Sequence, residues 1–190
     1  MLQKARIRTA WKSHDRTIPI NELANALSAI CWRIALYAAK NLHQQDFVYV
    51  NDKQRLAVVR EFLFFQIHLS DRLIHDRLTD DDRNELINSL SLNCLRHYAE
   101  NTMELLGSSP DMEETINTLN HVTNSLASFK FADQQPGYEM YRLLGARIRD
   151  ILGEDQTNKW VIDQIMEIDG PEIFELFNKS SSKLVKNSGY

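Results

Sequence analysis

Hydrophobic residues recur every three or four positions over most of the chain, a spacing that places them on one face of a helix. The first such segment covers residues 19–43, where the repeating apolar positions are Leu23, Leu27, Ile30, Ile34 and Tyr37. Similar segments cover residues 52–78, 80–106, 110–128, 138–152, 155–168 and 171–186. The pattern predicts an all-α protein, a bundle of about seven helices, with three long helices in its N-terminal half.

Residues that start or stop helices separate these segments. Asn51 and Thr79 precede the second and third segments, and their side chains can accept a hydrogen bond from the first turn of a helix. Gly107 marks the end of the third segment. At DGPE (169–172) we expect a sharp stop and restart, with Gly170 in a left-handed conformation and Pro171 in the next first turn. The isolated β-like run DFVYV (46–50) is interpreted as an extended connector.

The second segment, residues 52–78, carries two apolar stripes on nearly opposite sides of its helical wheel. One stripe contains Leu56, Val59, Leu63, Ile67, Ile74 and Leu78, and the other contains Val58, Phe62, Phe65, Leu69 and Leu73. A helix that is apolar on two sides packs against neighbours on both of them. We therefore expect this helix to lie at the centre of the bundle.

A line of polar residues runs between the two stripes and gives the chain its candidate site. Glu61, His68, Asp71 and His75 share this face. His68 and His75 are separated by about 10.5 Å along the helix axis, too far for both to bind one metal ion. The pairs His68–Asp71 and Asp71–His75 have a suitable spacing, so these four residues form a candidate site for a divalent transition metal, with further ligands from other helices.

Two other interpretations of this face stay open. In the favoured one no cofactor binds, and Asp71 simply accepts hydrogen bonds from His68, His75 or Arg72, because buried polar groups need partners. In the other, the face is a metal-free acid–base or ligand pocket. The Glu-x-x-His pairs typical of metal sites in helical bundles are absent from the sequence.

Charge changes the picture at the N-terminus. Residues 1–16 carry a net charge of +4, and the remaining residues carry −8, for a total of −4. Basic and apolar residues alternate from Lys4 to Arg8, which indicates an extended arm over residues 1–16 ahead of a single helical domain over 17–190. The acidic character of residues 17–190 disfavours nucleic acid as a partner, since the phosphates of nucleic acids bind to basic surfaces.

Composition and motifs narrow the function further. With 43% hydrophobic residues in 190, the chain can bury one core, but no segment is apolar enough for a membrane span or a signal peptide. The widely spaced Cys31 and Cys94 are expected to be buried free thiols. Motifs of nucleotide binding and nucleophilic catalysis are absent from the sequence. We expect a small bacterial protein of the cytoplasm.

These observations favour a non-enzymatic interaction or structural module. We expect it to form a homodimer or to bind another protein partner. The acidic and aromatic segment 158–177 is a candidate docking surface. The alternative function is a metal-binding bundle or enzyme built around the polar face of residues 52–78.

Overall fold

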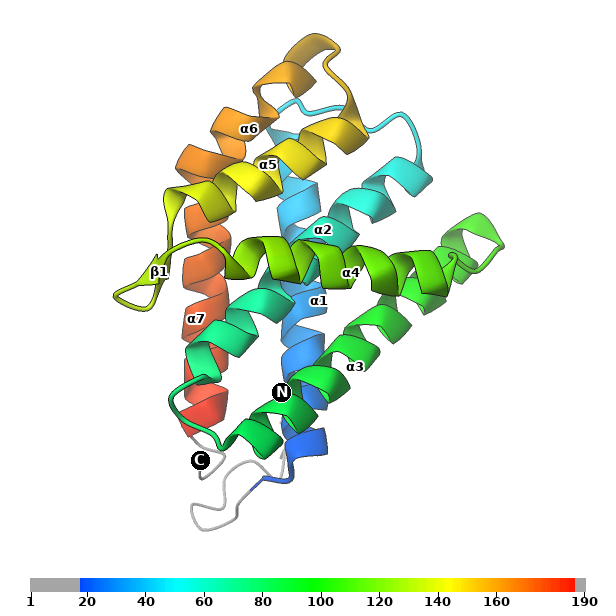
Figure 1. Cartoon of the computed structure of the whole chain (residues 1–190). Helices are drawn as coiled ribbons and strands as arrows, with labels where there is room; N and C mark the ends of the chain where they lie inside the picture. Colours follow the sequence, from blue (N-terminus) through cyan, green and yellow to red (C-terminus); the bar gives the residue numbers. More distant parts are fainter. Residues whose placement is uncertain (1–17, 187–190) are drawn as a thin grey trace, which may run out of the picture.

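Helices dominate the computed structural model, which describes residues 18–186 (Figure 1). The helical elements are α1 (Ile20–Gln44), α2 (Asp52–Ile74), α3 (Asp80–Leu106), α4 (Met112–Ala127), α5 (Tyr138–Leu152), the 3-10 helix η2 (Gln156–Trp160), α6 (Val161–Gln164), the π-helix η3 (Ile165–Asp169) and α7 (Gly170–Lys186). Within the described range the only strands are β1 (Phe131–Ala132) and β2 (Gln135–Pro136), which pair as a small hairpin. The predicted all-α bundle is confirmed, and the predicted N-terminal arm lies outside the described residues.

The ends of the long helices follow local side-chain chemistry. The Asn51 side chain accepts a hydrogen bond from the Gln54 backbone N–H at 2.8 Å, and Thr79 accepts one from Asp82 at 3.2 Å. Gly107 ends α3 with a φ of 71°, a left-handed conformation that suits a residue without Cβ. The second helix stops at Ile74 instead of residue 78, because the chain turns over residues 75–78 before α3 begins.

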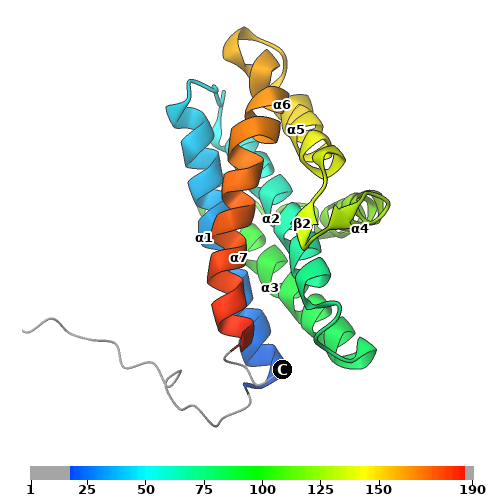
Figure 2. The ribbon, with the colours of Figure 1, turned by 90° about the vertical axis from the view of Figure 1, so that its left-hand side faces the viewer.

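Helix α2 occupies the centre of the bundle, as its two apolar stripes predict. Every residue from Glu61 to Ser70 is buried. Helices α4 and α5 cross one side of α2, and α1 and α7 run side by side on the opposite side (Figures 1 and 2). Helix α3 packs against both α1 and α2. The polar face of α2 is therefore enclosed by different neighbours along its length.

The predicted stop at DGPE is wrong, and the described chain has six helices instead of seven. Helices α6, η3 and α7 run on without a break, and Gly170 has a helical φ of −62°. A proline in a regular α-helix clashes with the carbonyl four residues before it. Here the residues before Pro171 form a π-helix, in which the Gly170 N–H donates to the Ile165 carbonyl five residues earlier. Gly170 is needed for another reason: an added Cβ would lie 2.5 Å from both the Ile165 carbonyl oxygen and Cδ1 of Tyr141.

Candidate functional site

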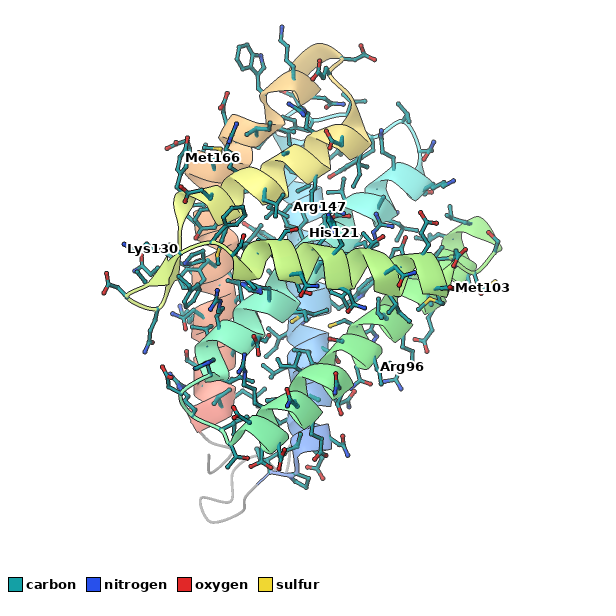
Figure 3. The ribbon with its side chains drawn as sticks, in the orientation of Figure 1. Arg96, Met103, His121, Lys130, Arg147 and Met166 are labelled. Carbon is teal, nitrogen blue, oxygen red and sulfur yellow. The ribbon has the colours of Figure 1, made fainter. Side chains whose placement is uncertain are left out.

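The four polar residues predicted to form one site on α2 are divided among separate surroundings. Glu61 is only 1% exposed and lies under α5. Its carboxylate accepts hydrogen bonds from Arg147 Nε at 2.5 Å and Nη2 at 3.2 Å, and from Arg60 Nη2 at 3.0 Å. Figure 3 shows Arg147 between α5 and α4, near His121. Both residues border a shallow surface groove. Glu61 thus joins α5 to the central helix.

His68 and Asp71 lie further along α2 and pair with arginines. His68 is buried, and its Nε2 accepts a hydrogen bond from Arg72 Nε at 3.4 Å. Burial, and secondly the charge of Arg72, lower the pKa of His68 to about 4, so the imidazole is neutral at pH 7. Asp71 accepts two hydrogen bonds of 2.7 Å from Arg83 of α3.

His75 lies beyond the end of α2, with a side chain that is 55% exposed and beside Asp76. Within residues 18–186, no three His, Cys, Asp or Glu side chains gather closely enough to hold a metal ion. The lone pairs that His68 and Asp71 would offer a metal accept hydrogen bonds from arginines instead. A divalent metal at His68, Asp71, His75 and Glu61 stays a prediction from the sequence.

His68 and Asp71 do share a recess of about 310 Å³, which is enclosed by α2, α3 and α4. The α3 and α4 walls are mostly polar. Their amide and hydroxyl side chains are Asn84, Asn88 and Ser91 of α3, and Asn120, Thr123 and Asn124 of α4. In each helix the asparagines are four residues apart, which places them on one face. This spacing is visible in the sequence, but the sequence does not reveal that the two faces meet across His68.

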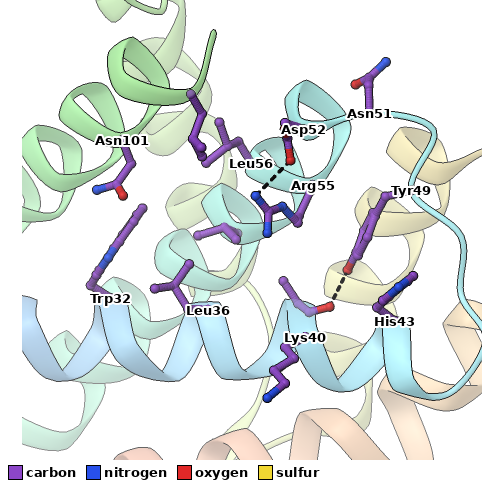
Figure 4. A pocket seen from close by; sticks show the side chains of 13 residues that line it. Trp32, Leu36, Lys40, His43, Tyr49, Asn51, Asp52, Arg55, Leu56 and Asn101 are labelled. Atoms are coloured by element: carbon purple, nitrogen blue, oxygen red, sulfur yellow. Dashed lines mark hydrogen bonds and ion pairs between the residues drawn. The ribbon is translucent and has the colours of Figure 1, made fainter.

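A larger groove of about 420 Å³ lies where α1, α2 and α3 meet (Figure 4). Its apolar lining includes Trp32 and Leu36 of α1 and Leu56 of α2, and the Tyr49 hydroxyl donates a hydrogen bond to the Ala39 carbonyl. Lys40 and the ion pair between Arg55 and Asp52 border the groove. Arg55 and Asp52 offset each other's charge at the rim, and the Lys40 side chain points away from Arg55 and Leu56 (Figure 4). Sequence reasoning missed this groove because its residues come from three helices and a connector.

The exposed side of α1 forms a basic stripe, which we define as Arg33, Leu36 and Lys40. Leu36 and Lys40 also line the groove. Leu36 is 42% exposed, although a leucine on a helix in a bundle usually faces the core. The basic stripe is thus both charged and partly apolar.

Near the C-terminal end of α1, the segment formed by η2, α6 and η3 exposes an acidic stripe, defined as Trp160, Asp163, Glu167 and Ile168. Trp160 is 57% exposed and Ile168 is 53% exposed. This stripe belongs to the predicted docking segment 158–177, in which Lys159 and Glu175 are exposed as well. Lys159 Nζ lies 5.3 Å from the centre of the Trp160 ring.

Two contacts fix the acidic stripe next to α1. Asn41 of α1 donates a hydrogen bond to Asp169 at the end of η3, and the Tyr37 hydroxyl donates one to Glu172 at 2.7 Å. Asp169 is 1% exposed, and burial raises the pKa of its carboxyl. Helix α7 is the segment that lies alongside α1 (Figure 2), and the acidic stripe lies near the C-terminal end of α1 and beyond it, on elements that pack against α5.

None of the helices in residues 18–186 combines the length and apolar character needed to cross a membrane. The chain matches no protein-family model, no curated protein and no solved structure.

Proposed function

We propose that this protein is a cytoplasmic, non-enzymatic interaction module that forms a homodimer through the face bearing the basic and acidic stripes. The observation that carries the proposal is the order of charges on the surface, where the positively charged stripe of α1 is followed by a negatively charged stripe beyond the end of that helix. A two-fold axis between the stripes brings the basic stripe of each copy against the acidic stripe of the other. Such a face is complementary to itself, as an isologous dimer interface requires.

Apolar surface supports the same arrangement. Leu36, Tyr37, Trp160 and Ile168 are each more than 40% exposed in the single chain. In the dimer, Trp160 of the second copy would enter the groove at Trp32, where an aromatic side chain meets an apolar lining. Aromatic anchors that fill a partner's groove supply much of the binding energy of protein interfaces.

The cysteines support the cytoplasmic part of the proposal. Cys31 and Cys94 are both buried and free. A hydrogen bond with the Cys31 thiol, and secondly burial, raise the pKa of Cys94, which keeps the thiol protonated. Free thiols are typical of proteins that function in a reducing compartment.

Sedimentation velocity over a concentration series tests the dimer. The wild-type chain should sediment as a dimer at tens of micromolar. Trp160→Ala should weaken the dimer by at least about tenfold, the effect of a loss of roughly 1.4 kcal/mol at a well-packed aromatic contact. Tyr138→Ala is the matched control, since Tyr138 is 60% exposed at the start of α5, outside both stripes.

The proposal fails if the wild-type protein remains a monomer throughout the series. It also fails if Trp160→Ala and Tyr138→Ala have the same effect on the dimer. Because both side chains are exposed, neither change should unfold the chain.

A further inference from the structure

The recess above His68 has an unusual chemical character that the proposed dimer does not use. It opens between α3 and α4, whereas the two stripes lie on α1 and on η2–η3 (Figure 1). Residues of α2, α3 and α4 line it, and its volume is about 310 Å³. A compact ligand suits this volume better than an extended chain.

The recess carries no net charge. Asp71 and Arg83 neutralise each other through two hydrogen bonds of 2.7 Å. His68, in the floor, is neutral at pH 7 because burial lowers its pKa to about 4. The other polar lining residues are amides and hydroxyls. A charged ligand such as a phosphate or a carboxylate would find no opposite charge available here.

The walls nevertheless offer many hydrogen-bonding groups. Each of the four carboxamides, on Asn84, Asn88, Asn120 and Asn124, can donate two hydrogen bonds and accept two. Within the described residues none of these side chains has a hydrogen-bond partner in the protein. All four side chains are exposed, so their donors and acceptors are open to solvent and to a ligand above an apolar floor that includes Ile67 and Leu119.

The residues that line the recess favour some uncharged ligands over others. Nucleobases are commonly held by stacking on aromatic side chains, and no Phe, Tyr or Trp lines the recess among the described residues. A sugar needs several mixed donors and acceptors for its hydroxyl groups, and its C–H face can lie on aliphatic side chains. The recess provides both.

We propose that the recess between α3 and α4 binds an uncharged sugar, whose hydroxyl groups would be held by the carboxamides of Asn84, Asn88, Asn120 and Asn124. In this arrangement His68 lies below the ligand and offers its imidazole edge. Ile67 and Leu119 contact the sugar's apolar face.

Side-chain amide signals in ¹H–¹⁵N NMR spectra test this directly. D-glucose, D-galactose and N-acetyl-D-glucosamine should each be titrated to about 50 mM, which nearly saturates a site with a Kd of about 1 mM. At least one sugar should shift the signals of the four asparagines with a single Kd. The signal of Asn117, which lies on α4 outside the recess, should stay in place.

Variants then locate the site. Asn88→Leu and Asn124→Leu should each weaken sugar binding at least tenfold, whereas Asn117→Leu should not change it. All three residues are exposed, so the fold should survive each substitution.

The proposal is overturned if none of the three sugars moves the four signals. It is also overturned if triglycine or adenine moves them and the sugars do not, since the recess would then hold a peptide or a base. Equal binding by Asn88→Leu, Asn124→Leu and wild-type protein would place the sugar elsewhere and would overturn it as well.

Discussion

Glu61→Gln should lower the free energy of unfolding by about 3 kcal/mol, the typical cost of breaking a buried ion pair from one side. The carboxylate is 1% exposed and accepts hydrogen bonds from Arg147 and Arg60. Glutamine keeps the shape of the side chain but removes its charge, which leaves two partly buried guanidinium groups without a counterion. Chemical denaturation at pH 7 measures the loss.

Two comparisons make this prediction specific. Glu113→Gln, at an exposed position in the first turn of α4, should change stability by less than about 0.5 kcal/mol. The double variant Glu61→Leu/Arg147→Met should recover much of the loss, because replacing both members of a buried pair by apolar residues is often nearly neutral. A loss below about 1 kcal/mol in Glu61→Gln would contradict the role of Glu61 as the anchor of α5.

His68 should make the protein sensitive to acid. Its pKa is about 4 in the folded chain, against an ordinary value of 6.5, so the unfolded chain binds a proton more tightly between these values. The stability that His68 contributes is fully present above pH 6.5 and is lost as the pH falls towards 4. At 1.36 kcal/mol per pKa unit, the loss is on the order of 3 kcal/mol.

Denaturation of wild-type protein and His68→Gln over pH 4–7.5 measures this contribution, since other titrating groups cancel in the difference. His68→Gln should be the less stable of the two at pH 7.5, and the difference should shrink or reverse near pH 4. His75→Gln is the control, because His75 is exposed and should follow the wild-type curve. Parallel curves for wild type and His68→Gln would show that His68 is not held neutral by burial.

The sequence allowed the helices to be predicted well because their ends depend on neighbours along the chain. The caps at Asn51 and Thr79 and the stop at Gly107 involve residues within one turn. The continuation through Pro171 could not be anticipated in this way. It depends on a π-turn and on the close approach of Tyr141 of α5 to Gly170 of α7, two residues from different helices.

The candidate site shows the same limit. The helical wheel placed Glu61, His68 and Asp71 on one face, but their partners come from other parts of the chain. Glu61 meets Arg147 of α5, whereas Asp71 meets Arg83 of α3. A helix as long as α2 crosses several neighbours, so residues on one face can enter different environments. Helical periodicity says nothing about which neighbour covers which turn.

A charge exchange between Lys40 and Glu167 tests the proposed dimer most directly. Both side chains are exposed, one in each stripe. Lys40→Glu and Glu167→Lys should each weaken self-association, because like charges would then meet at both contacts of the symmetric pair. When the two single variants are mixed, each contact in a heterodimer joins opposite charges.

Sedimentation velocity of the two single variants, alone and in an equimolar mixture, is therefore the decisive measurement. The dimer through the basic and acidic stripes predicts that each variant alone sediments mainly as a monomer, and that the mixture sediments as a dimer. A mixture that remains monomeric, or single variants that dimerise as well as the wild type, would contradict it.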